Sequence, residues 1–184
     1  LPVMTGLGRH EAADFRGADL VIKNPGVRLS SPFLALAREA GVPIETDVSV
    51  FLRVATNPIV AVSGTKGKST VASAIHHGLL ISHPEARLGG NITVSPLTFV
   101  TPPATLAPGA PVVLELSSWQ LGALRGLGLL DPVVSLLTVI FPDHMDAYGG
   151  DMDAYVADKR AILEEQSGSH VAVLNAEVAD DGYT

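Results

Sequence analysis

The sequence predicts an α/β fold in which helices cover both faces of a parallel β-sheet. Short apolar runs alternate with amphipathic segments along the 184 residues. Several of these runs are apolar at every position, which is typical of strands buried on both faces of a parallel sheet. One run is followed by a glycine-rich loop and then by an amphipathic segment, the order in which phosphate-binding loops occur. We therefore expect a doubly wound parallel sheet that contains a P-loop.

The individual elements follow from hydrophobic periodicity and from turn residues. The expected strands are residues 20–22, 43–45, 59–63, 112–116, 133–140 and 171–174. The expected helices are residues 32–40, 69–80 and 152–165. The segment 101–111, rich in proline and alanine, is expected to be a surface connection.

Two domains are expected, because the segment 45–58, which ends in Asn57-Pro58, is interpreted as a linker. Residues 1–46 would be the end of a smaller, Rossmann-like α/β domain. Residues 47–184 would be a nucleotide-binding domain that begins with the P-loop strand.

Composition excludes several classes of protein. The net charge of −7 and the lack of any Lys/Arg run disfavour nucleic-acid binding. The longest apolar stretch, residues 127–141, is interrupted by Asp131-Pro132, so no membrane span is expected. The sequence contains no cysteine, which fits a cytoplasmic protein.

The segment 59–70 carries the strongest functional signal. Its glycines, Gly64 and Gly67, let backbone N–H groups point into one concavity, and the following helix adds its positive end. Lys68 can reach terminal phosphates, and Ser69 can bind Mg²⁺. Val62 stands where the longer P-loop form has glycine, so the match is to a shorter variant. We expect ATP or GTP to bind here; the alternative is a glycine-rich turn with an incidental lysine.

Polar residues follow two of the expected strands, at the sheet edge where ligands of such folds bind. Glu115 follows an apolar run and could hold Mg²⁺ directly or through water; otherwise it is a solvated strand end. The segment Asp143-His144-Met145-Asp146 follows another strand, which suggests a metal-linked role for His144 rather than an ordinary surface histidine. Gly89-Gly90-Asn91 is either a simple turn or a close approach to a ligand.

Lys159 occupies an unusual position. It completes the apolar stripe of the helix expected at 152–165, where a charged group is costly unless it is paired, reaches solvent or loses its charge. One interpretation is a lysine whose amine extends to solvent. The other is a neutral amine that reacts with CO₂ to form a carbamate, an anionic metal ligand.

Together these segments resemble the Mur ligase family. Residues 64–70 resemble its P-loop, usually written GTNGKST, and residues 89–92 resemble its GGNIG segment. Residues 115–121 resemble ELSSFQL, and residues 143–146 resemble DHMDR, followed at the expected distance by Lys159 and by Leu174-Asn175-Ala176. Residues 18–21 and 24–27 resemble the end of the family's first domain, which carries the uridine nucleotide.

The resemblance implies an ATP-dependent, peptide-forming ligase of peptidoglycan precursor synthesis. The form of residues 115–121 is typical of the member that adds D-glutamate to UDP-N-acetylmuramoyl-L-alanine through an acyl phosphate. ATP, two Mg²⁺ ions and these two substrates would then be the ligands, and the protein would be a monomer.

The resemblance also implies roles for individual residues. Lys68, His144 and Lys159 would be catalytic. The nucleotide would be bound by Gly64, Thr65, Lys66, Gly67, Lys68, Ser69 and Thr70. Ser69 and Glu115 would hold one Mg²⁺, and His144 and carbamylated Lys159 the second. Asn91, Ser117 and Gln120 would contact the muramoyl substrate.

This sequence departs from the family pattern at Lys66, where asparagine is usual, and at Thr93, Pro142 and Ala147. The family's third domain, which brings the amino acid, is not found in it, so residues 1–184 alone are expected to have little ligase activity. Folylpolyglutamate synthetases also have lysine at the loop position of Lys66, which makes a ligase of that kind one alternative. The others are a non-catalytic Mur-like nucleotide-binding protein and a plain P-loop NTPase or kinase.

Overall fold

The structure is a computed structural model that describes residues 8–92, 94–102 and 104–180. Thr93, one of the departures noted above, lies outside the described residues. The chain forms two compact units, Leu1–Thr46 and Asp47–Thr184, each of which is described by itself. No helix of the described residues is long and apolar enough to cross a membrane.

The first unit is a small α/β arrangement. It contains α1 (Ala12–Arg16), β1 (Val21–Ile22), α2 (Pro32–Glu39) and β2 (Ile44–Glu45). The two strands pair in parallel, with Val21 opposite Ile44. Helix α2 starts with proline at its first turn, where the missing N–H is not needed, and buries Leu34 and Ala37. The strands and the helix expected for residues 20–45 are confirmed to within one residue at each end.

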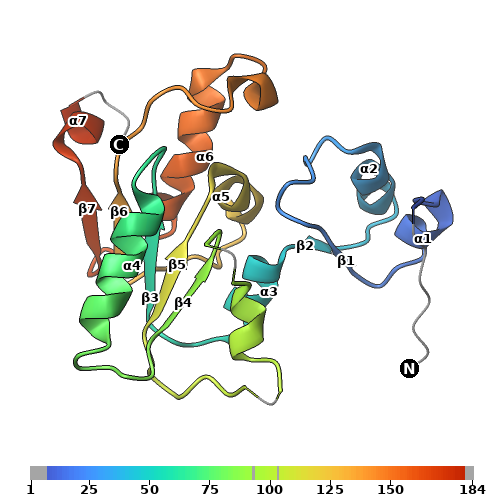
Figure 1. Cartoon of the computed structure of the whole chain (residues 1–184). Coiled ribbons are helices and arrows are strands. Elements are labelled where there is room, and N and C mark those ends of the chain that lie inside the picture. Colours follow the sequence, from blue (N-terminus) through green and yellow to red (C-terminus); the bar gives the residue numbers. More distant parts are fainter. Residues whose placement is uncertain (1–7, 93, 103, 181–184) are drawn as a thin grey trace. The chain divides into compact units, whose positions relative to one another are not determined.

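The second unit contains a parallel sheet of five strands in the order β4-β5-β3-β6-β7 (Figure 1). The strands are β3 (Ile59–Ser63), β4 (Arg87–Gly90), β5 (Val112–Glu115), β6 (Val134–Leu137) and β7 (Val171–Leu174). The order changes direction at β3, which lies in the middle of the sheet. The expected parallel, doubly wound fold is confirmed.

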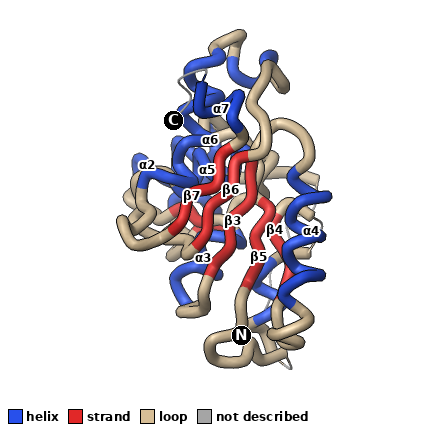
Figure 2. The backbone as a smooth tube through the Cα atoms, turned by 90° about the vertical axis from the view of Figure 1, so that its left-hand side faces the viewer, coloured by secondary structure: helices blue, strands red, loops and turns tan. Residues whose placement is uncertain are grey.

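Helices cover both faces of this sheet (Figure 2). Helix α4 (Lys68–Leu79) lies on one face, and α5 (Ser118–Leu124) and α6 (Met152–Glu164) lie on the other. Alternate residues of β3 serve the two sides: Ile59 and Ala61 pack in the core beneath α5 and α6, and Val60 and Val62 pack beneath α4. Burial on both faces explains why this strand is apolar throughout.

One expectation was wrong. The segment interpreted as a linker contains helix α3 (Asp47–Val54). Val48 and Phe51 are fully buried, and Phe51 packs edge to face on Phe99 of the short helix η1 (Pro96–Phe99). Val48, Phe51 and Leu52 have helical spacing, so their burial in the core fixes the segment as a helix.

Strand β6 ends at Leu137, three residues before the expected end at 140. The chain after Leu137 turns around the loop that follows β3: the Thr138 hydroxyl donates to the Lys66 carbonyl at 2.6 Å, and the Val139 carbonyl accepts from the Thr65 N–H at 2.6 Å. Pairing with that loop therefore replaces pairing within the sheet.

Several short elements were not expected from the sequence. They are α1, α3, β4, η1, α5, η2 (Met145–Tyr148) and α7 (Ala176–Asp180). Helix α5 carries a capping box, in which the side chains of Ser117 and Gln120 each bond to the other residue's backbone N–H. The Ser-x-x-Gln spacing was the signal for this helix.

Replacing glycine by alanine should have opposite effects on stability at Gly78 of α4 and at Gly122 of α5, because only Gly122 lies against another helix, α6. A Cβ at Gly122 would lie 2.6 Å from Asp158 Oδ2, whereas a Cβ at Gly78 of α4 would meet no atom within 4 Å. We expect Gly78→Ala to stabilise the protein by about 0.5–1 kcal/mol through helix propensity. Gly122→Ala should instead destabilise it by about 1 kcal/mol or more, because the Asp158 carboxylate, which is bonded to the Tyr148 hydroxyl and to Arg125, would have to move. Urea denaturation measures both; equal stabilisation by the two changes would contradict this packing.

Candidate active site

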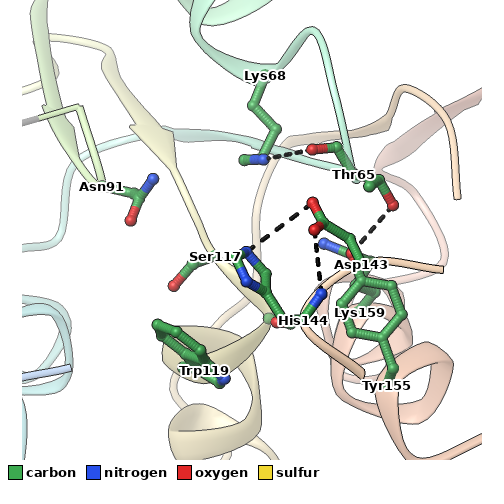
Figure 3. Close-up of a pocket in the computed structure, with 10 residues that line it drawn as sticks. Thr65, Lys68, Asn91, Ser117, Trp119, Asp143, His144, Tyr155 and Lys159 are labelled. Carbon is green, nitrogen blue, oxygen red and sulfur yellow. Dashed lines mark hydrogen bonds and ion pairs between the residues drawn. The ribbon is translucent and has the colours of Figure 1, made fainter. Parts of the chain in front are cut away.

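The loop of residues 64–70, called the phosphate loop below, lies at the carboxyl end of β3, where the strand order changes direction. Ligands of doubly wound sheets bind at such positions. A pocket of about 100 Å³, partly open to solvent, lies beside it (Figure 3). It is lined by Thr65, Lys68, Asn91, Ser117, Ser118, Trp119, Asp143, His144, Tyr155 and Lys159.

The backbone of the phosphate loop requires its glycines. Gly64 and Gly67 have φ values of 135° and 83°, which side-chain-bearing residues rarely adopt. A Cβ at Gly64 would also collide with the Thr138 hydroxyl. Gly67 is the N-cap of α4, so the loop leads directly to the free N–H groups of that helix.

The side chains of the loop point in different directions. Lys68 Nζ donates to the Thr65 carbonyl at 3.0 Å and faces the pocket. Lys66 is exposed, and its Nζ lies 3.5 Å from Asp143 Oδ2. Ser69 and Thr70 are exposed at the start of α4 and do not line the pocket.

Thr65 connects the phosphate loop to two other elements. Its hydroxyl lies 3.0 Å from the Tyr155 hydroxyl of α6 and accepts from the Phe141 N–H at 3.2 Å. Burial raises the pKa of Tyr155, so this phenol stays protonated and can donate to Thr65. The loop is thereby held against α6 and against the segment that follows β6.

Glu115 and Asn91 form a second side of the site. Glu115, at the end of β5, is only 1% exposed. Its Oε1 accepts from Asn91 Nδ2 at 2.8 Å, and its Oε2 is buried with no hydrogen-bond partner among the described residues. A buried carboxylate oxygen left in this way is costly unless a cation or donor reaches it.

His144 is held in an unusual conformation on the third side. Its φ of 55° is the only positive value at a non-glycine residue in the described part of the chain. Its ring packs against Trp119 of α5 at 5.2 Å between centroids, and its N–H donates to Asp143 Oδ1. Burial alone would raise the pKa of Asp143, but the nearby charges of His144 and Lys66 lower it overall.

Lys159 lies deep in the protein, as its place in the apolar stripe predicted. It is 2% exposed; its Nζ donates to the Gly64 carbonyl at 2.8 Å and lies over the Tyr155 ring, 4.8 Å from the centroid. Burial, and next the charge of Lys68, lower the pKa of Lys159 to about 7. Asp143 and Asp158 oppose this shift. A large fraction of this amine is therefore neutral near physiological pH.

Ser117 and Gln120 differ in what they offer a ligand. Ser117 caps α5 and lines the pocket. Gln120 is buried, and its Oε1 accepts from the Ser117 N–H at 2.9 Å and from the Ser117 hydroxyl at 3.0 Å. Gln120 does not line the pocket; the substrate contact expected for it stays a prediction, and its observed effect is on the position of Ser117.

A second, mostly apolar groove lies on the other side of the phosphate loop. It is lined by Lys66, Gly67, Val71, Leu136, Leu137, Thr138, Val139, Val173, Leu174 and Asn175. Nowhere in the described ranges do three His, Asp or Glu side chains gather as a ready-made metal site.

Comparison with known proteins identifies the family. Residues 62–182 match the Mur ligase middle domain. The chain belongs to the Mur ligase family. The resemblance seen in the sequence is thus confirmed, and every residue that lines the pocket lies within the matched range.

Curated relatives are more specific. The chain is 46% identical over 190 residues to UDP-N-acetylmuramoylalanine–D-glutamate ligase of Treponema pallidum, and the match covers 96% of this chain and 34% of that protein. It is 38% identical over 177 residues to the ligase of the same name from Roseiflexus, covering 96% and 37%. The chain therefore spans about a third of the length of these relatives.

Solved structures agree on the fold. UDP-N-acetylmuramate-alanine ligase from Thermotoga maritima is 26% identical, with a TM-score of 0.51, and the match covers 92% of this chain and 38% of that one. UDP-N-acetylmuramate:L-alanyl-γ-D-glutamyl-meso-diaminopimelate ligase from Neisseria meningitides is similar with a TM-score of 0.60 at 17% identity, and the match covers 92% of this chain and 57% of that one.

The sequence assigned no individual role to four of the residues that line the pocket: Ser118, Trp119, Asp143 and Tyr155. Tyr155 belongs to the buried face of α6 and lies one helical turn before Lys159. The polar end of tyrosine usually finds a partner when buried, which was the available signal. Trp119 lies between Ser117 and Gln120, but nothing in the sequence placed it against His144.

The lowered pKa of Lys159 predicts a pH-dependent stability. Between about pH 7 and pH 10.5, the unfolded state binds more protons than the folded state, so the free energy of unfolding should rise with pH. Lys159→Met lacks this titration. In CO₂-depleted buffer, the stability of the wild type relative to Lys159→Met should increase as pH is raised from 7 to 10 and should be constant below 7. Chemical denaturation measures it, and a difference that does not vary with pH would contradict a titrating buried amine.

Proposed function

We propose that this protein is an ATP-dependent ligase of peptidoglycan precursor synthesis, which joins D-glutamate to UDP-N-acetylmuramoyl-L-alanine. One observation carries the proposal: residues of the phosphate loop, His144 and the buried amine of Lys159 line one pocket, and the buried carboxylate of Glu115 is hydrogen-bonded to Asn91 of its wall. Relatives that carry this name are 38–46% identical over nearly the whole chain. ATP and UDP-linked precursors are cytoplasmic metabolites, so we place the protein in the cytoplasm, and we expect a monomer.

The two units would divide the binding of substrates. Residues 1–46, with the turn Asn24-Pro25-Gly26, would form part of the domain that holds the uridine nucleotide. Residues 47–184 would bind ATP. The phosphates would lie on the backbone of residues 64–70 at the N-terminus of α4, and the base would enter the apolar groove beside Gly67. Lys68 would exchange the Thr65 carbonyl for a phosphate oxygen.

The reaction follows from the chemistry of the two substrates. A carboxylate oxygen of the muramoyl substrate attacks the γ-phosphorus of ATP, and the bond to the bridging oxygen breaks to release ADP. The amine of D-glutamate then attacks the acyl phosphate, and inorganic phosphate and a proton leave as the amide forms. Lys68 stabilises negative charge on the transferred group, and Asn91 and Ser117 offer an amide and a hydroxyl to the substrate from the pocket wall.

The residues present fit bound Mg²⁺. The partnerless Oε2 of Glu115 suits a hard cation, and Ser69 at the first turn of α4 could join it. His144 and a carbamate on Lys159 could hold a second ion together with the nucleotide. When bound, Mg²⁺ supplies neutralisation of the phosphate charge.

The surroundings of Lys159 also fit carbamylation. Its amine attacks CO₂, forms an N–C bond and releases one proton, which requires the neutral form that the lowered pKa provides. The product keeps one N–H, which can continue to donate to the Gly64 carbonyl. Its new carboxylate would place an anion in the pocket near His144.

Lys66 favours a second candidate, a folylpolyglutamate synthetase-like ligase, since a lysine at this position occurs in that group. Both candidates form an acyl phosphate, so only the carboxylate substrate separates them. A non-catalytic Mur-like protein would bind nucleotide but transfer no phosphoryl group.

The proposed reaction predicts phosphate release that depends on both substrates. With the protein in its full natural length, ATP, UDP-N-acetylmuramoyl-L-alanine and D-glutamate should give turnover, and folate with glutamate should not. Lys68→Met should lower kcat about 100-fold or more through lost charge stabilisation. His77→Ala, an exposed change on α4 outside the pocket, is the matched control and should retain activity. Turnover with folate alone would support the second candidate, and nucleotide binding without phosphate release would support the non-catalytic one.

A carbamate on Lys159 predicts chemical rescue. Lys159→Ala should lose most activity, because the anionic ligand is gone, and short carboxylates such as formate or acetate should restore part of it. In the wild type, labelled bicarbonate should give a ¹³C NMR carbamate signal that is missing in Lys159→Ala. Full activity of the variant without added carboxylate would show that no carbamate is needed.

A further inference from the structure

Lys66 belongs to the phosphate loop, but the reaction proposed above gives its side chain no specific task. Its main chain is fixed, because its carbonyl accepts from the Thr138 hydroxyl at 2.6 Å. Its side chain is 67% exposed and can therefore change partner without disturbing the core. The residue lines the apolar groove, while its ammonium group reaches toward the pocket on the other side of the loop.

The partner of Lys66 belongs to the opposite wall of the pocket. Lys66 Nζ lies 3.5 Å from Asp143 Oδ2, and the other oxygen of the same carboxylate accepts from the His144 N–H at 3.0 Å. His144 Nε2 lies 3.9 Å from Asp143 Oδ2. Asp143 is thus shared between a cation of the phosphate loop and the residue expected to bind metal.

An exposed ion pair of this length is easily exchanged. Such pairs contribute little to stability, because water screens them and the side chains lose freedom. A terminal phosphate carries more negative charge than a carboxylate and forms stronger charge-assisted hydrogen bonds with an ammonium group. If the backbone of residues 64–70 holds the inner phosphates, the γ-phosphate would extend past them and could meet the exposed ammonium group of Lys66.

We propose that Lys66 selects nucleoside triphosphates over diphosphates, because its ammonium group exchanges Asp143 for the γ-phosphate when a triphosphate binds. After the exchange, Asp143 no longer pairs with Lys66 and keeps its contact with His144. The inference rests on the proposed nucleotide site, and it assigns a role to the position at which this chain has lysine in place of the usual asparagine.

The test measures affinity rather than turnover. A non-hydrolysable ATP analogue and ADP are titrated by calorimetry into the full-length wild type, Lys66→Asn, Lys66→Arg, Asp143→Asn and the double variant. Lys66→Asn should weaken binding of the ATP analogue about tenfold and binding of ADP less than about twofold, because only the γ-phosphate, which ADP lacks, loses a charged partner. Lys66→Arg should keep the preference. Asp143→Asn should strengthen analogue binding in the wild-type background but not in Lys66→Asn.

The outcomes separate the inference from the proposed function. Equal weakening of both nucleotides by Lys66→Asn, or no weakening, overturns the role of Lys66 while leaving the nucleotide site intact. An effect of Asp143→Asn that persists in the Lys66→Asn background also overturns it, because the carboxylate would then act by general repulsion. If the wild type binds neither nucleotide, the proposed function fails, and this inference fails with it.

Discussion

The hydrogen bond from Lys159 to the Gly64 carbonyl is the interaction on which the site depends. It crosses from α6 to the first residue of the phosphate loop, and the Tyr155–Thr65 contact one helical turn away runs parallel to it. Both contacts fix a loop whose glycines would otherwise leave it conformationally free. Because α6 also packs on α5, the same helix sets the position of Trp119 and, through it, of the His144 ring.

The three walls of the pocket come from segments far apart in the chain that the sheet brings together. β3, β5 and β6 are adjacent and parallel, so the loops that follow them open at the same edge. This topology places Lys68 and His144 around one pocket and Glu115 behind its wall, bonded to Asn91, although they are separated by dozens of residues in sequence. A single charged residue at the end of one strand is common in proteins. Several such residues close together indicate a site that can bind a ligand or catalyse a reaction.

The sequence was sufficient for the parallel sheet, the phosphate loop and the inward position of Lys159, because these depend on local pattern. It was insufficient where tertiary contacts decide. Helix α3 was taken for a linker because the contact that buries it, between Phe51 and Phe99, joins segments far apart in the sequence. Strand β6 was predicted too long because the residues after Leu137 pair with the phosphate loop instead of continuing in the sheet. The side chain of Gln120 also could not be assigned from sequence, since capping and substrate contact use the same amide.

Two groups in the site are poorly satisfied by the protein alone, and this links binding to stability. Glu115 has a buried oxygen without a partner in the described structure, and Lys159 is buried with its charged form disfavoured. Well-packed apolar residues at these places would make a more stable fold. A bound cation would give the Glu115 oxygen a partner, and carbamylation would give the Lys159 amine a charge that a cation can balance. Ligands that bind only the folded state in this way stabilise it. Two such groups, one at the end of β5 and one on α6, are therefore expected beside a binding site and not in a structural core.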